Sequence, residues 1–171
     1  VSRELEDEAL RWLRRDDAPT GLYWKWRVEG RTNVGSRRAG SAASRLAPGD
    51  VPDAALDRIR LVHLTGITMA ISETARELVV DVARRAKERG ALVLFDPNFR
   101  PTLPDTPEAA AERQRGVLPY VDWYLCGEGE AALLWPDGGI PVRSVVRIGA
   151  RGAMVDGTCV PPPRTAPVVD E

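Results

Sequence analysis

Two kinds of element are predicted by the pattern of hydrophobic and polar residues along this chain. Apolar and polar positions alternate from Leu22 to Val28, and segment 34–39 reads as the returning strand of a β-hairpin. Residues 3–15 carry apolar residues at helical spacing and predict a short amphipathic helix. Because a two-stranded ribbon needs something to pack on, we expect the hairpin to be a lid, a clasp or an interface.

From residue 47 onward, short apolar runs alternate with longer segments of helical period. The predicted strands are 60–64, 91–95, 121–125 and 142–148, and the predicted helices are 51–58, 73–89, 107–118 and 128–134. Ser72 is the expected N-cap of the long second helix, and Gly90 is expected to close it. Segment 153–155 reads as a hairpin partner of the last strand, and the tail from Thr158 as having little regular structure. This order predicts an α/β fold with a parallel sheet flanked by helices.

Each predicted strand of the sheet ends in a polar or glycine-rich loop, and these loops read TGIT, DPNFR, CGEGE and GARG. In α/β folds such loops meet at the carboxyl edge of the sheet and build the ligand crevice. Asp96, Asn98 and Arg100 lie on one of these loops, which Pro97 and Pro101 stiffen. Because the Arg100 guanidinium is a planar fork for carboxylate or phosphate, the loop suits a polar, anionic small molecule.

Three further features each allow two interpretations. Glu128 and Glu130 at a predicted helix start either complement the helix dipole or serve outer-sphere coordination of Mg2+. The glycines of segment 147–152 either form a simple β-turn or let the backbone approach a nucleotide. Arg37 and Arg38 either form a solvated face or contact an anion from the hairpin.

Composition excludes several classes of protein. The 171 residues suffice for one domain with a core, and the net charge of −1 gives no field for nucleic acid or an anionic membrane. We find no apolar run of membrane-spanning length and no leader pattern, which together with two sparse cysteines, Cys126 and Cys159, indicates a cytoplasmic protein with reduced thiols. The single histidine, His63, lies in an apolar strand and is interpreted as a core residue, so no hydrolytic triad is expected.

Six segments of the chain, in order, resemble the PfkB (ribokinase-like) family of carbohydrate kinases, and most closely its 2-keto-3-deoxygluconate kinase branch. The segments are PTGLYWKWRVEG (19–30), RRAGSAASRLAPGD (37–50), VHLTGITMAIS (62–72), LFDPNFRPTLP (94–104), VDWYLCGEGEAALL (121–134) and VVRIGARGAMV (145–155). The resemblance implies a partial ribokinase-like α/β domain over 1–20 and 48–171, with a small β-clasp lid over 21–47 that often mediates dimerisation.

The resemblance also implies where a sugar acid binds. Tyr23, Arg38 and Arg100 fall where the family contacts the sugar acid, and the two arginines would recognise its carboxylate or ketone end. Asn98 lies in the same DxNxR loop. Gly35 and Ser36 depart from the family pattern, because this branch usually has aromatic residues there.

ATP and Mg2+ are the cofactors that the resemblance implies. Glu130 matches the glutamate of the family's NxxE motif, which organises Mg2+ and phosphates, although Gly127 stands in place of the asparagine. Arg147, Gly149 and Gly152 match the KxGxxG segment beside the nucleotide, with arginine in place of lysine.

The ends of the chain depart from the family pattern most. The glycine-rich sugar motif with which the family begins has no match, and Asp170 and Glu171 resemble only the first two residues of the second signature. The GAGD run of that signature, with its anion hole and its catalytic aspartate, would lie beyond Glu171. We therefore expect no catalytic base within the chain and negligible kinase activity from these residues alone.

Three functional hypotheses follow. The first is a sugar kinase that transfers the ATP γ-phosphoryl group to a hydroxyl of a sugar acid, with a homodimer formed through the lid. The second is a catalytically dead sugar- or nucleotide-binding or interaction module. The third, a nucleotide-binding α/β domain of other chemistry such as a dinucleotide enzyme, is disfavoured because no GxGxxG motif follows a strand.

Overall fold

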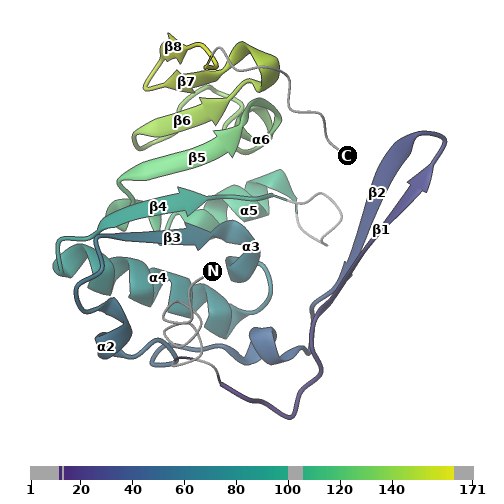
Figure 1. The fold of residues 1–171 in the computed structure, drawn as a ribbon. Coiled ribbons are helices and arrows are strands. Elements are labelled where there is room, and N and C mark those ends of the chain that lie inside the picture. The colour runs from purple at the N-terminus through teal and green to yellow at the C-terminus, as the bar shows by residue number, and fades with distance from the viewer. Residues whose placement is uncertain (1–11, 13, 100–105, 164–171) are drawn as a thin grey trace.

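The computed structural model describes residues 12, 14–99 and 106–163, which form a helix-flanked sheet and a separate hairpin (Figure 1). The strands are β1 (Leu22–Val28), β2 (Arg31–Arg37), β3 (Leu61–Thr65), β4 (Leu92–Asp96), β5 (Trp123–Gly127), β6 (Ser144–Arg147), β7 (Ala153–Val155) and β8 (Thr158–Val160). The helices are α2 (Asp53–Leu56), α3 (Gly66–Met69), α4 (Glu73–Glu88), α5 (Pro107–Gln114) and α6 (Glu128–Leu134), with 3-10 turns η1 (Ala42–Arg45), η2 (Leu118–Tyr120) and η3 (Gly149–Arg151). The predicted helix 3–15 lies almost entirely outside the described residues. Within those residues, no helix combines the length and the apolar character needed to cross a membrane.

The main sheet has six strands in the order β3-β4-β5-β6-β7-β8. Strands β3 to β6 are parallel, as predicted, and β7 runs antiparallel to β6, which confirms the predicted hairpin partner. The expectation of an irregular tail from Thr158 is wrong, because β8 pairs antiparallel with β7. Asp156 (φ 45°) and Gly157 (φ 81°) join these strands with two left-handed residues. An Asp-Gly pair in this conformation is a favoured two-residue hairpin turn, so the sheet is mixed and not purely parallel.

The long helix α4 begins and ends where the sequence predicts. The Ser72 hydroxyl accepts a hydrogen bond from the Ala75 N–H at 3.1 Å, which satisfies one of the free donors of the first turn. Gly90 adopts a φ of 76° just past the last turn, a conformation that glycine reaches without strain. The buried face of α4 consists of Ala75, Leu78, Val79, Val82, Ala83 and Ala86.

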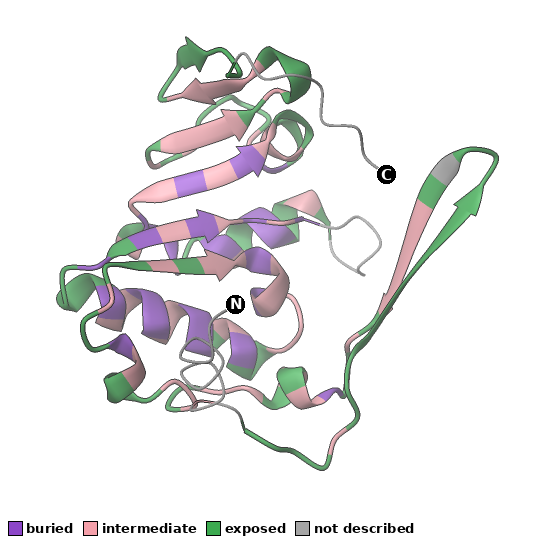
Figure 2. Ribbon diagram, in the orientation of Figure 1, coloured by how far each residue is buried: buried purple, intermediate pink, exposed green. Residues whose placement is uncertain are grey.

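One face of the sheet carries the core. Val93, Phe95, Tyr124 and Cys126 are inaccessible to solvent and belong to a single apolar cluster with α4 (Figure 2). On the other face, Leu92 is 48% exposed and no described helix packs on it. Because side chains alternate between the two faces along β3, His63 lies on this open face. It is exposed, so its interpretation as a core histidine is wrong.

A buried polar contact joins three elements of the core. The Tyr124 hydroxyl on β5 donates to the Gln114 side-chain oxygen of α5 at 2.7 Å and accepts the Trp135 indole N–H at 3.2 Å. Gln114 is only 3% exposed, so its oxygen depends on this protein partner. Burial raises the pKa of Tyr124 well above its ordinary value and keeps the hydroxyl protonated.

The hairpin β1-β2 stands apart from the sheet, on the side toward which strands β3 to β6 point (Figure 1). Its register pairs Trp24 with Gly35, and the Trp24 indole fills the space that a side chain at Gly35 would need. Trp24 therefore occupies the room beside Gly35, a position where the resemblance would have placed an aromatic residue. Alternation along β1 places four apolar side chains on one face of the hairpin. They are Leu22, Trp24, Trp26 and Val28, each between 45% and 59% exposed.

Candidate functional site

The loop after β4 is the first component of the candidate site. Asp96 ends β4, and its Oδ1 accepts the Asn98 N–H at 2.9 Å, which closes a tight turn over Pro97. Asn98 adopts a φ of 43°, a left-handed conformation that asparagine tolerates better than most residues. Arg100, the predicted carboxylate contact, lies outside the described residues.

Glu130 holds this loop against the start of helix α6. Its Oε1 accepts the Phe99 N–H at 2.9 Å, and its Oε2 accepts the Gly127 N–H at 2.9 Å. The Glu130 side chain is 19% exposed, so both bonds are largely shielded from water. The bond to Gly127 is the half of a capping box in which the N3 carboxylate accepts the N-cap N–H, and Gly127 has no side chain with which to make the other half.

Arg147, at the end of β6, faces the same junction. One guanidinium nitrogen lies 3.4 Å from Asp96 Oδ2 and the other lies 3.6 Å from Glu130 Oε2. The Arg147 side chain is 56% exposed while both carboxylates are mostly covered. Because long, solvated ion pairs are weak, the arginine can leave its carboxylates for a more highly charged ligand.

The two predicted nucleotide glycines follow Arg147 and have different surroundings. Gly149 (φ 63°) has open space beside it, so a phosphate group of a ligand has room to approach the backbone there. Gly152 (φ 101°) lies against β8, where an added Cβ would come within 2.1 Å of the Val160 carbonyl oxygen. Packing within the sheet therefore already requires glycine at Gly152. Between them, Arg151 pairs with Glu128 at 2.8 Å on the exposed surface.

The base of the hairpin forms the second component of the site. Tyr23 and Arg38 line a cavity of about 310 Å3, together with Ser41 and Ile71. Ser41 is buried and lies directly after the turn that follows β2. Ser41 is not among the site residues predicted from the sequence, although it lies inside the AGSAAS run that carries the family resemblance.

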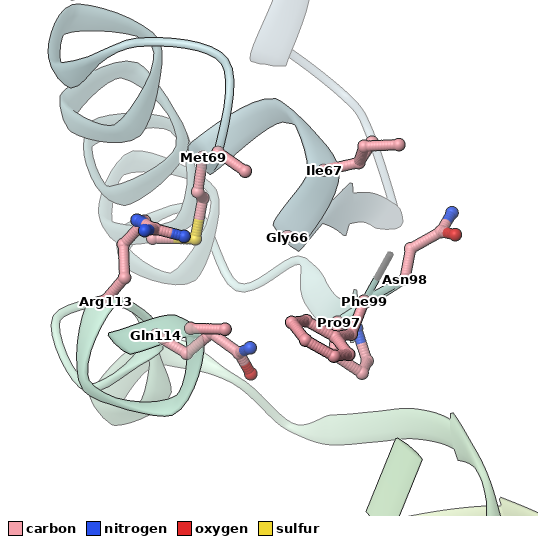
Figure 3. A pocket seen from close by; sticks show the side chains of 10 residues that line it. Gly66, Ile67, Met69, Pro97, Asn98, Phe99, Arg113 and Gln114 are labelled. Atoms are coloured by element: carbon pink, nitrogen blue, oxygen red, sulfur yellow. The ribbon is translucent and has the colours of Figure 1, made fainter. Parts of the chain in front are cut away.

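Helix α3 lies beside the loop after β4, at a place where the sequence predicts only a TGIT loop. Thr65 caps it by accepting the Ile67 N–H at 3.4 Å. Its first residue, Gly66, touches the loop after β4, because a Cβ there would lie 2.4 Å from the Pro97 carbonyl oxygen. A void of about 10 Å3 remains between α3, this loop and α5 (Figure 3), room for about one water molecule and too small for a sugar. Figure 3 shows the Asn98 amide pointing away from this void.

Within the part of the chain that the structure describes, Glu130 suits a magnesium ion in an outer-sphere position. The described residues contain no cluster of three His, Cys, Asp or Glu side chains that could hold a metal. Each oxygen of Glu130 already accepts a backbone hydrogen bond, which leaves room for a contact to a metal-bound water. Glu130 would then orient the hydration shell of the ion without binding the ion directly.

Known sugar kinases are similar to this chain over much of its length, although no protein-family model matches it. The chain is 39% identical over 109 residues to a 2-dehydro-3-deoxygluconokinase from Thermoproteus tenax, a match that covers 62% of this chain and 31% of that enzyme. It is 31% identical over 139 residues to a 2-dehydro-3-deoxygluconokinase from Bacillus subtilis (strain 168), covering 78% and 43% respectively. The chain therefore spans less than half the length of either curated relative.

The fold agrees with these sequence matches. The crystal structure of a PfkB protein from Polaromonas sp. JS666 superposes with a TM-score of 0.65 at 35% identity, over 81% of this chain and 51% of that one. That overlap includes a sheet flanked by helices, as predicted. By sequence and by fold, the chain is similar to the PfkB carbohydrate kinases over the part of those kinases that it spans.

Proposed function

We propose that this chain serves a cytoplasmic kinase that transfers the γ-phosphoryl group of ATP to a hydroxyl of a 2-keto-3-deoxy sugar acid. The relatives' name denotes kinases of 2-dehydro-3-deoxygluconate, which is the same compound as 2-keto-3-deoxygluconate. The proposal rests on the contacts of Glu130. This side chain accepts the Phe99 N–H on the loop after β4, which we propose meets the sugar acid, and it faces Arg147 at the end of β6, which we propose meets the nucleotide.

The sugar acid would lie between the hairpin and the carboxyl edge of the sheet. Tyr23 and Arg38 approach from the hairpin, while Asn98 and Arg100 belong to the loop after β4. Two arginines suit a substrate with a carboxylate, because each guanidinium offers a fork of donors to the two oxygens.

ATP would lie along the end of β6 and the turn that follows. The exposed Arg147 guanidinium would exchange its two carboxylate partners for phosphate oxygens, and Gly149 would allow close approach of the backbone. Glu130 would hold the hydrated Mg2+ through water. In this chemistry, positioning and electrostatic stabilisation account for most of the catalysis.

A second candidate function, a module that binds these ligands without turnover, is supported by the carboxylates of the junction. Asp96 accepts the Asn98 N–H, and Glu130 accepts two backbone N–H groups, so neither is a free general base. We therefore propose that the 171-residue chain by itself binds ligand and turns over little.

An ADP-release assay on the 171-residue chain, with ATP–Mg2+ and 2-keto-3-deoxygluconate, separates these functions. Nucleotide binding measured by calorimetry without ADP release supports the binding module, and turnover of ~1–100 s⁻¹ supports an active kinase. Arg147→Gln should weaken ATP–Mg2+ binding and leave sugar-acid binding within about two-fold. A folded chain that binds neither ligand would show the proposed function to be wrong.

We also propose that the hairpin mediates a homodimer. Its apolar face, formed by Leu22, Trp24, Trp26 and Val28, is exposed in the single chain. Water-exposed tryptophans of this kind are enriched in protein interfaces. Two hairpins packed through these faces would remove them from solvent and would hold each lid over its own sheet edge.

A further inference from the structure

Two polar atoms at the base of the hairpin are buried without a hydrogen-bond partner among the described residues. They are Arg38 Nε and Ser41 Oγ. Ser41 is only 3% exposed, so bulk water does not replace the missing partner. Because an unpaired buried donor is costly, two of them at one place indicate a ligand that completes their hydrogen bonds.

The backbone brings these two side chains together. The Ser41 N–H donates to the Arg38 carbonyl oxygen at 3.1 Å, which closes a tight turn, and Gly40 within that turn has a φ of 70°. The Ala42 N–H donates to the Pro19 carbonyl oxygen at 2.9 Å and anchors the turn to the segment that leads into β1. Arg38 and Ser41 therefore extend from a fixed frame and not from a free loop.

Both residues line the same cavity of about 310 Å3, which is large enough for a small metabolite. Among the described residues that line it, Arg38 is the only charged one, and no acidic side chain is present. Arg38 forms no salt bridge with a described residue, so its positive charge is not neutralised there by protein. An anionic group is the ligand that this environment favours.

We infer that Ser41 is a specificity residue of the sugar-acid site, an inference that rests on the function proposed above. Ser41 lines the cavity, and its hydroxyl has no partner among the described residues. The hydroxyl donates to a carboxylate oxygen of the sugar acid, and Arg38 Nε–H donates to the same carboxylate. The pair thus distinguishes a sugar acid from a neutral sugar of similar size.

Calorimetric titration of the 171-residue chain with 2-keto-3-deoxygluconate tests this, using Ser41→Ala and Ser44→Ala. Ser41→Ala should weaken sugar-acid binding about five- to ten-fold, and it should leave the melting temperature of the free protein unchanged or raised, because no protein hydrogen bond is lost. Ser44 lies on the same segment, but its hydroxyl donates to the Ser41 carbonyl oxygen at 2.7 Å and it does not line the cavity. Ser44→Ala should therefore lower the melting temperature and keep the affinity within about two-fold.

The outcomes are distinct. If the original chain binds the sugar acid and Ser41→Ala binds it equally well, the inference is wrong while the proposed function stands. A lower melting temperature with unchanged affinity in Ser41→Ala would show that the hydroxyl is structural, which also overturns the inference. If the folded original chain does not bind the sugar acid, the proposed function is wrong and the inference falls with it. The inference is supported if Ser41→Ala binds the sugar acid more weakly than the original chain does, while both proteins bind D-fructose only weakly.

Discussion

Glu130 accepts the backbone N–H of Phe99 at 2.9 Å, although the two residues lie 31 positions apart in the chain. The same carboxylate caps helix α6 through Gly127 and faces the guanidinium of Arg147. One side chain therefore sets the position of the loop after β4 relative to the end of β6. In a two-substrate phosphoryl transfer these are the two elements whose spacing must be correct, since the rate depends on how the reacting groups are placed.

Replacing Glu130 by glutamine should destabilise the fold. The amide keeps one acceptor oxygen but presents an NH2 group to the second backbone N–H, so one buried donor loses its partner. We expect a loss of about 1–3 kcal/mol in the free energy of unfolding, measured by urea denaturation. Glu128→Gln is the matched control in the same helical turn. Its exposed pair with Arg151 should contribute less than about 1 kcal/mol. Equal effects of the two substitutions would contradict a bracing role for Glu130.

Gly66 should not tolerate even one added methyl group. In Gly66→Ala the Cβ would lie 2.4 Å from the Pro97 carbonyl oxygen, so either helix α3 or the loop after β4 must move. We expect a destabilisation of about 1–3 kcal/mol by thermal unfolding. The control Gly129→Ala adds a methyl group within α6 where nothing lies within 4 Å. Because alanine favours helix over glycine, it should be neutral or stabilising by up to about 1 kcal/mol. Equal tolerance of both alanines would show that the contact between α3 and the loop is not tight.

The buried hydroxyl of Tyr124 should be necessary for stability. In Tyr124→Phe the Gln114 oxygen and the Trp135 indole N–H both lose the partner seen in the structure. We expect a loss of about 1–3 kcal/mol in unfolding free energy. The double variant Tyr124→Phe, Gln114→Leu should recover part of this loss, since the buried amide is then removed as well. Additive losses would argue against a direct hydrogen bond between the two residues.

Alkaline pH should weaken the fold through Cys126. Burial, and secondarily the negative charge of Glu130, raises the pKa of this thiol from 9.0 to about 11. The thiol ionises in the unfolded chain first, so its contribution is intact below pH 9 and is lost as pH rises toward 11. Cys126 alone should contribute a slope of about 1.4 kcal/mol per pH unit in this window, to which the buried Tyr124 adds at higher pH. Urea denaturation at several pH values, compared with Cys126→Ala, isolates the effect. If the unfolding free energy of Cys126→Ala fell with pH as steeply as that of the original chain, the effect would not come from Cys126.

The apolar face of the hairpin should control self-association. Trp26→Ser should shift the chain toward monomer in sedimentation experiments, because it removes a large apolar group from the proposed interface. Lys25→Ser, on the opposite face of the same strand, should leave the association unchanged. A chain that is monomeric at all accessible concentrations, or equal effects of both variants, would speak against a dimer through this face.

The sequence predicts the parts of this fold that depend on local signals. The limits of β1, the caps Ser72 and Gly90, and helix α6 all follow from alternation, capping and helical period. Strand β8 was not predicted although its Asp156-Gly157 turn is a readable signal, because proline residues beyond it suggest irregular structure. His63 was expected in the core because its strand is apolar, but periodicity cannot show that only one face of the sheet is covered by described helices.

The site was predictable as a set of loops and not as a set of contacts. The resemblance pointed to Glu130 and Arg147 through motif spacing. Their connection to Asp96 and Phe99 depends on the order of β4, β5 and β6 in the sheet, which no local pattern specifies. Ser41 could not be predicted because a serine in a run of small residues carries no chemical signal until its burial is known.

The central claim, that this chain carries a site for a sugar acid, is tested most directly by calorimetric titration with 2-keto-3-deoxygluconate, alone and with ATP–Mg2+ present. We predict saturable binding that is stronger than for D-fructose, both alone and with ATP–Mg2+ present. Absence of saturable binding to a chain shown to be folded, or equal binding of the neutral sugar, would contradict the account.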